Sequence, residues 1–305
     1  MKLLWWTSIL GLSLLLTGCN TADETTAVAA MASYTHDYID EPTPIDEEVV
    51  SPEVPEAVEE TGITGNLTHL TYGDVHVYLF GSMHVGSPDW FPLHPAVYRA
   101  MDVADVFAFE YDLSIDPVVI ASMTVQHLLT SGQGSDLPPF VRYTQAMIEA
   151  FEAVGLSQQY SLDKYILAQA VANNAPVEGL IPLAQELALV MNQPIDVQDW
   201  LVSHFPDLDE LVAEAYDTKY LYATQDFEGL TALMTASEDG YNLLEQWLRE
   251  EVLAKRTDLF AAGIVQLVSE MTSGSLFVTV GIGHLLGEGS VAEMLVQQGF
   301  LPFAS

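Results

Sequence analysis

Residues 75–84 have the sequence VHVYLFGSMH, in which a β-prone apolar run ends at a glycine and is followed by a histidine. This pattern predicts a buried strand. Residues 106–110, VFAFE, predict a second buried strand, and residues 95–103 between the two have helical spacing. Strands joined through a helix lie parallel, and ligands in such sheets bind beyond the carboxyl ends of the strands. We therefore expect His84 and Glu110 to face one crevice.

The same pattern returns near the end of the chain. Residues 276–284, LFVTVGIGH, again place glycine, two residues and a histidine after a buried strand, and a helix follows at 290–298. Glycine at such a strand exit allows close backbone approach or a positive φ. One G-x-x-H motif is weak evidence, because a buried histidine is usually a hydrogen-bonded structural residue. Two copies, with a carboxylate that ends a third strand, favour a shared site.

The chemistry that suits two imidazoles and a carboxylate is binding of a divalent metal with open positions. Nitrogen and oxygen donors fit zinc, manganese, cobalt or iron, and such a metal activates water for hydrolysis. We expect His84 and His284 to be metal ligands and Glu110 to be a ligand or general base. Asp112 is either a fourth ligand or base, or a loop cap.

Two further residues have alternative roles. His94 precedes the first expected helix, so it either supports the site or starts that helix. Arg256 is one of only eight basic residues, and its expected partner is either a buried carboxylate or a carboxylate of the substrate.

The overall pattern predicts an α/β domain with a mostly parallel sheet. Residues 67–79 alternate around a Tyr72-Gly73-Asp74 turn and predict a hairpin. A helical layer, at about 115–272, is expected between the two motif regions. Its expected helices are residues 120–129, 141–154, 163–172, 184–191, 197–201, 208–220 and 227–235, with one or two more at 243–272.

The charge is unusual for a chain of 305 residues. Eight Lys and Arg residues against 43 Asp and Glu residues give a formal net charge of −35. Such a surface repels other polyanions, which argues against nucleic acid or anionic lipid surfaces as partners.

The amino-terminal region divides into two segments ahead of the domain at 63–305. Residues 1–18 combine Lys2, an apolar core and a small-residue site before Cys19, which resembles the lipobox of bacterial lipoproteins. The alternative is an ordinary secretory signal with a chance cysteine. Residues 19–62 hold twelve acidic residues and no Lys or Arg, so we expect a disordered tether. Cys19 is the only cysteine, which excludes disulfides within the chain.

The chain resembles the TraB/PrgY/GumN family from about residue 63 to residue 302. The resemblance is carried by YLFGSMHVG at 78–86, by 106–112 with Glu110, and by VGIGHLLG at 280–287. Weaker correspondences are Leu162 with Asp163, Gly179 with Leu180 and Gln185, and Arg256. The chain departs from the family pattern at Ile181, where Glu is usual, and at Thr257, where Asn is common.

This resemblance implies a fold similar to the erythromycin esterase and ChaN proteins, and kinship with the Tiki metalloproteases. In Tiki proteins the corresponding histidines and glutamate carry peptide cleavage that depends on manganese or cobalt. His84, His284 and Glu110 are the matching residues here.

Two functions follow as hypotheses. The first is an envelope-anchored, metal-dependent hydrolase, with a peptidase as the favoured type. It would act on a peptide or small molecule and contact the membrane through its lipid anchor only. The second is a lipoprotein that holds haem, a metal or a peptide without turnover. Asn20, in place of the aspartate that retains some lipoproteins at the inner membrane, favours the outer membrane.

The lipobox predicts that Cys19→Ala leaves the protein unprocessed or releases it from the envelope fraction. Fractionation with and without detergent, followed by mass spectrometry of the amino-terminal peptide, measures this. Wild-type protein found free in the periplasm with an unmodified Cys19 would contradict the expectation.

Overall fold

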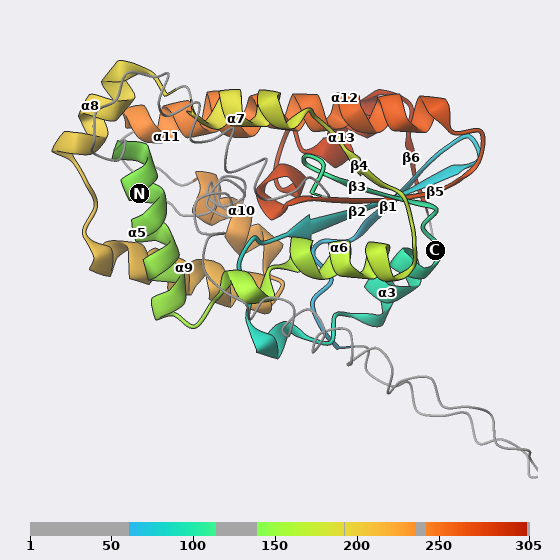
Figure 1. Ribbon diagram of the computed structural model, residues 1–305, viewed down its shortest axis with the longest axis horizontal. Coiled ribbons are helices and arrows are strands. Elements are labelled where there is room, and N and C mark those ends of the chain that lie inside the picture. Colours follow the sequence, from blue (N-terminus) through green and yellow to red (C-terminus); the bar gives the residue numbers. More distant parts are fainter. Residues whose placement is uncertain (1–60, 114–138, 192, 236–241, 304–305) are drawn as a thin grey trace, which may run out of the picture.

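The computed structural model of the protein describes residues 61–113, 139–191, 193–235 and 242–303 (Figure 1). The expected helix at 120–129, the signal peptide with Cys19 and almost all of the expected tether lie outside the described residues.

A six-stranded sheet forms the centre of the structure, in the order β4-β3-β5-β2-β1-β6. Its strands are β1 (Thr68–Tyr72), β2 (Val75–Ser82), β3 (Val106–Phe109), β4 (Val177–Gly179), β5 (Gly274–Gly281) and β6 (Leu301–Pro302). The neighbours β4, β3, β5 and β2 pair in parallel, whereas β1 is antiparallel to β2 and to β6. The mostly parallel α/β sheet and the hairpin of β1 and β2 are thus confirmed.

Strand β5 lies between β2 and β3, although β2 and β3 are consecutive parts of the βαβ unit. Ser82 of β2 is in register with Gly281 of β5, and Phe109 of β3 is in register with Thr279. The two strands that carry the G-x-x-H motifs are therefore neighbours, and all three strands end at the same edge of the sheet.

The helices are close to those expected from sequence periodicity. They are α3 (Pro95–Asp102), α5 (Pro139–Ala153), α6 (Leu162–Ala172), α7 (Leu183–Met191), α8 (Ile195–Ser203), α9 (Leu208–Ala223), α10 (Phe227–Thr235), α11 (Leu243–Trp247), α12 (Lys255–Glu270) and α13 (Val291–Gln297). A π-helical segment, η4 (Leu248–Ala254), joins α11 to α12. The helical layer also contains β4, which was not predicted because its three residues are too few to show alternation.

Apolar side chains alternate between the two faces of the sheet. Val77, Leu79 and Val278 belong to a core that includes residues of α12 and α13. Phe80 and Phe277 point to the opposite face, into a larger core that includes residues of α3, α5 and α6. Figure 1 shows α12 on one side of the sheet and α3 and α6 on the other. The domain is a layered α/β structure.

Within the part of the chain that the structure describes, no helix is both long and apolar enough to cross a membrane.

Helix α12 packs closely on the loop between β4 and α7, and this contact predicts the effect of one substitution. A Cβ at Gly263 would lie 2.4 Å from the carbonyl oxygen of Leu180. Gly263→Ala should therefore lower the free energy of unfolding by about 1–3 kcal/mol, because backbone must move to admit the methyl group. Helix propensity alone would give a gain of about 1 kcal/mol.

Urea unfolding followed by circular dichroism measures this change. Gln266→Ala on the exposed side of the same helix is the matched control, with an expected change within about 0.5 kcal/mol. A stabilised Gly263→Ala protein would show that α12 does not sit this close to Leu180.

Candidate functional site

The carboxyl ends of β2, β3 and β5 bring the three predicted residues together. Nε2 of His84 lies 3.9 Å from Oε2 of Glu110, and Nε2 of His284 lies 3.9 Å from Oε1. All three side chains are buried. Each imidazole thus faces one oxygen of a shared carboxylate, although the two histidines lie far apart in the sequence.

His84 is held by Asp163, in the first turn of α6. Oδ2 of Asp163 lies 2.7 Å from Nδ1 of His84, and Oδ1 accepts a 2.6 Å hydrogen bond from the hydroxyl of Ser82. Because a carboxylate only accepts, Nδ1 must carry the proton. In neutral His84 the lone pair is then on Nε2, a buried atom that has no hydrogen-bond partner in the described structure.

The loop after His84 explains how Asp163 reaches it. Gly86 and Ser157 exchange two backbone hydrogen bonds, of 2.9 and 2.8 Å, and the amide of Leu162 donates to the carbonyl oxygen of Met83. A Cβ at Gly86 would lie 2.0 Å from the carbonyl oxygen of Tyr160, so only glycine fits there. This close approach sets the start of α6 against the first G-x-x-H motif.

His284 is held in an equivalent way by Thr257 of α12. The Thr257 hydroxyl lies 2.7 Å from Nδ1 of His284 and donates a 2.8 Å hydrogen bond to the carbonyl oxygen of Leu253. Since a hydroxyl has a single proton, Nδ1 of His284 is the donor to Thr257. Nε2 of His284, on the side of Glu110, is therefore the unprotonated nitrogen.

Glu110 is fixed by a backbone amide and by a buried guanidinium. Its Oε1 accepts a 2.7 Å hydrogen bond from the amide of Gly281, and its Oε2 lies 2.5 Å from Nη2 of Arg256. Arg256 also binds Glu186 of α7, through Nε at 3.0 Å and Nη2 at 2.7 Å. Of the two partners considered for Arg256, the structure shows buried carboxylates.

The two histidines titrate in opposite directions. Burial disfavours the imidazolium of His84, but the charges of Asp163 and Glu110 outweigh burial and raise the pKa of His84 above 6.5. For His284, burial and the nearby charges of Arg256 and His84 all lower the pKa well below 6.5. His284 is therefore neutral near pH 7, while His84 readily takes up a proton.

The pKa values of two nearby carboxylates, Glu186 and Asp163, are also shifted in opposite directions. Burial raises the pKa of Glu186 to about 7, with a further rise from Glu110, although Arg256 opposes it. For Asp163, burial favours the neutral acid, but His84 and Ser82 outweigh it and lower the pKa. Asp163 is therefore ionised in the range in which Glu186 titrates.

The donor set suits a divalent metal in its chemistry, but the three side chains are not arranged around a common point as in a formed metal site. Among the described residues, no three His, Cys, Asp or Glu side chains are already arranged as a formed metal site. However, the buried Nε2 of His84 needs a partner, and both imidazoles have Nδ1 anchored as metal-ligating histidines do. Each Glu110 oxygen also retains a second lone pair. The residues fit a metal in donor chemistry, and binding would require the two 3.9 Å gaps to adjust.

The other two candidates, His94 and Asp112, are not part of this cluster. His94 caps α3, because its Nδ1 accepts a 3.1 Å hydrogen bond from the amide of Ala96. Asp112 is half-buried in the loop after β3. Neither residue supplies any of the contacts described above for the two histidines and Glu110.

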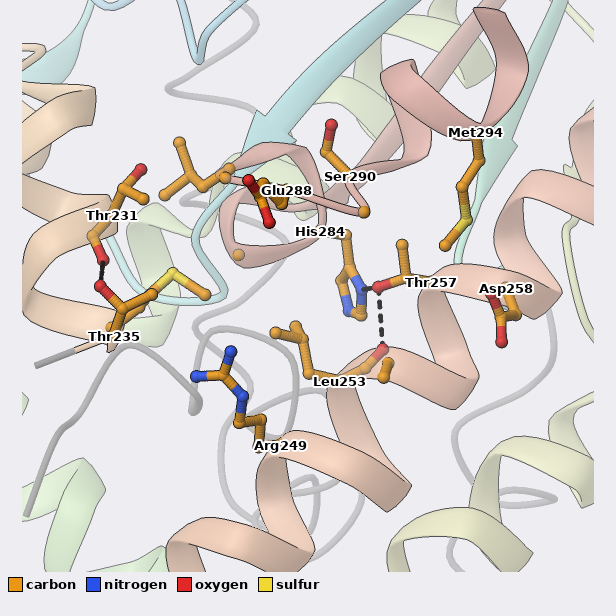
Figure 2. A pocket seen from close by; sticks show the side chains of 16 residues that line it. Thr231, Thr235, Arg249, Leu253, Thr257, Asp258, His284, Glu288, Ser290 and Met294 are labelled. Atoms are coloured by element: carbon orange, nitrogen blue, oxygen red, sulfur yellow. Dashed lines mark hydrogen bonds between the residues drawn. The ribbon is translucent and has the colours of Figure 1, made fainter. Parts of the chain in front are cut away.

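A pocket of about 480 Å³ adjoins the cluster on the Thr257 side of His284. It is lined by residues of α10, η4, α12 and the loop before α13 (Figure 2). His284 and Thr257 form part of its wall, whereas His84 and Glu110 lie outside its lining. The imidazole of His284 thus lies between the pocket and the other two residues of the cluster, His84 and Glu110.

Sequence reasoning did not assign roles to Glu186 or to the positioning residues Asp163 and Thr257. Asp163 had a signal, since it was a weak point of resemblance to the family. Thr257 and Ile181 are the two departures from the family pattern, and Thr257 supplies the hydroxyl that holds His284. Ile181 is buried among apolar residues, and the second carboxylate at Arg256 is that of Glu186. No local pattern in the sequence marks Glu186.

Comparison with known proteins places these features in a family. A protein named "Uncharacterized protein YbaP" from Escherichia coli (strain K12) is 26% identical over 247 residues, which cover 73% of this chain and 89% of the relative. The Shigella flexneri protein of the same name matches to the same extent. No solved structure matches the chain.

The family comparison covers both G-x-x-H motifs and Glu110. The family model described as "TraB/PrgY/gumN family" matches residues 66–139 and 135–302, which include β2, β3, β5 and the helical layer between the motifs. With the paired motifs adjacent in the sheet and most of the chain matched, the protein belongs to the TraB/PrgY/gumN family.

Proposed function

We propose that the protein is a hydrolase that acts with a divalent metal held by His84, His284 and Glu110. Manganese, cobalt and zinc are the candidate metals, because the donors are two imidazole nitrogens and a carboxylate. Peptides are the proposed substrate class, in line with the resemblance to the Tiki metalloproteases. The proposal goes beyond the family assignment, which by itself does not specify a reaction.

One observation carries this proposal, namely the buried Nε2 of His84. It has no hydrogen-bond partner in the described structure, and it lies 3.9 Å from Glu110 while Asp163 holds the opposite nitrogen. A buried polar atom without a partner costs about 1–3 kcal/mol, so its retention needs an explanation. A divalent metal ion bound to Nε2 of His84 would give this atom the partner that it lacks.

The residues around the cluster would keep it ordered for this role. Asp163 and Thr257 fix the tautomers of the two histidines, so that both Nε2 atoms face Glu110. The guanidinium of Arg256 and the amide of Gly281 hold the Glu110 carboxylate in place. A bound divalent metal would supply an activated water and polarise the scissile carbonyl.

A second candidate keeps hydrolysis but assigns the water activation to His84 alone. The His84–Asp163 pair has the arrangement of a general base and its orienting carboxylate, and the pKa of His84 is raised. The ion pair between Glu110 and Arg256 favours this version, because it already satisfies one carboxylate oxygen.

We also propose that the protein is anchored in the bacterial envelope through a lipid on Cys19, with the outer membrane favoured by Asn20. This part of the proposal depends only on the sequence at residues 1–20.

Metal analysis and a turnover screen test the function. The purified protein is stripped with a chelator and incubated with unstructured peptides, with and without manganese, cobalt or zinc. Turnover restored by metal supports the main proposal, and turnover that persists in the chelator supports the His84–Asp163 alternative. Stable binding of metal, haem or peptide without turnover would instead indicate a binding lipoprotein.

If both histidines ligate one metal, either His84→Ala or His284→Ala should abolish most metal uptake, because a site with two remaining ligands binds poorly. The double variant should then add little. Isothermal titration calorimetry on metal-free protein measures the affinity. His204→Ala, an exposed histidine at the end of α8, is the control and should bind metal normally. Full affinity in both single variants would rule out the shared site.

Glu110→Gln separates the two roles of the carboxylate. A general base would be lost with the metal still bound, so turnover falls and affinity stays. A ligand would be lost together with the metal, so both fall. Unchanged turnover in this variant would remove Glu110 from the mechanism.

Metal uptake should depend on the protonation of His84. A protonated imidazole cannot ligate, so affinity should fall by about tenfold for each pH unit below the pKa of His84. Since that pKa is raised, the decline should begin above pH 6.5, and His284, whose pKa is lowered, should add no second proton near that pH. Chelator competition from pH 5 to 9 measures the profile, and a midpoint at or below 6.5 would contradict the expectation.

A further inference from the structure

The pocket beside His284 has an uneven distribution of charge. Arg249 is the only Lys or Arg among its described lining residues, and Asp258 and Glu288 are its two carboxylates. Figure 2 shows Arg249 reaching toward the space between Thr235 and Leu253, with Asp258 on the far side of His284. Met234, Leu286 and Met294 supply apolar wall between the charges.

The π-helical segment η4 gives Arg249 this position. Arg249 and Leu253 of η4 line the pocket, and so does Thr257 just beyond it, whereas Arg256 contacts Glu110 of the three-residue cluster. A π-helix adds a residue to the turn, so one nearly continuous helix presents one arginine to each site. Such distortions are frequent at functional sites and are otherwise uncommon.

A cation in this pocket is unusual for so acidic a protein. The chain has eight Lys and Arg residues against 43 Asp and Glu residues. Lys255, Lys219 and Arg142 do not line this pocket, and they contact Glu251, the carbonyl oxygen of Val154 and the ring of Phe205. Arg249 therefore gives the pocket a local attraction for an anionic group that most of the surface repels.

We propose that the pocket binds a short peptide by its free C-terminal carboxylate, with Arg249 as the residue that recognises this group. A guanidinium has five N–H donors and matches a carboxylate in a bidentate manner, so it can bind a ligand while it keeps a protein partner. The hydroxyl oxygens of Thr231, Thr235 and Ser290 can accept hydrogen bonds from the N–H groups of a peptide, although the protons of Thr231 and Thr235 are donated to helix carbonyls. The volume lies within the range of small-ligand pockets.

The charge pattern favours a carboxylate over a phosphate. A phosphate dianion would face Asp258 and Glu288 with a single arginine to balance it. A monoanionic carboxylate needs one cation, and the amide N–H groups of a peptide can face the acidic residues. Because His284 lies in the wall, a peptide held there would place its last residues beside the proposed metal ligand. This assignment of substrate class rests on the proposed function, whereas binding to the pocket can be measured without turnover.

Calorimetry on metal-free protein provides the test, with leucyl-leucine, its C-terminal amide and inorganic phosphate as probes and with chromatography to verify that the peptides stay intact. Wild-type protein should bind the free acid at least about tenfold more tightly than the amide, since a charge-assisted pair is lost in the amide. Arg249→Met should remove this preference by weakening binding of the acid and leaving that of the amide unchanged.

Two further variants guard against misfolding. Arg249→Lys keeps the charge and should retain part of the preference. Arg142→Met removes an arginine that stacks on Phe205 outside the pocket and should leave the preference intact. Thermal melting verifies that each variant is folded.

The outcomes separate this inference from the proposed function. Equal affinity of wild-type protein for acid and amide, an unchanged preference in Arg249→Met, or tighter binding of phosphate than of the dipeptide would overturn the pocket assignment, even if peptides are hydrolysed. A preference that depends on Arg249 would support it, even if no metal restores turnover and the hydrolase proposal fails.

Discussion

Parallel pairing of β5 with both β2 and β3 is the constraint on which the rest of the structure depends. Without it, the two G-x-x-H motifs would end strands with no reason to meet. With it, Ser82 and Gly281 stand opposite each other, and the Glu110 carboxylate accepts the amide of Gly281 across 171 residues of sequence. The same pairing buries the apolar faces of all three strands, so packing energy and site geometry depend on one register. A slip of one residue would turn the core-facing side chains of β5 to the other face.

The cluster at the end of these strands concentrates several charged side chains in the protein interior. Glu110, Asp163 and Glu186 are buried together with Arg256 and His84, and an unpaired ion in such a place costs several kcal/mol. The structure meets this by pairing Asp163 with His84 and by placing Arg256 between the two glutamates. The pKa of His84 is raised above its usual value by Asp163 and Glu110, and burial raises the pKa of Glu186 to about 7. Entry of a divalent cation would thus be balanced by release of protons, together with the adjustment of the two 3.9 Å gaps between the histidines and Glu110.

The parts that could be predicted from sequence are those with a local periodic signal. Alternation and apolar runs located β2, β3 and β5, and helical spacing located α5, α6, α9 and α10 to within a few residues. The motifs at the strand ends then pointed to His84, His284 and Glu110. The order of the strands could not be predicted from sequence. Strands β2 and β3 are consecutive in the βαβ unit, but β5 lies between them in the sheet. The partners Asp163, Thr257 and Glu186 come from other elements through contacts between distant residues, and no local pattern records such contacts.

The position of β5 also has a consequence for the order in which the chain can fold. During synthesis the β1–β2 hairpin emerges early, but a two-stranded hairpin is marginal alone. The strand that fills the gap between β2 and β3 comes only after the whole helical layer, so most of the parallel sheet cannot assemble until nearly the full length is available. Long-range parallel pairing is also intrinsically slow. The centre of the sheet in this protein is therefore completed by one of the last segments of the chain to be synthesised.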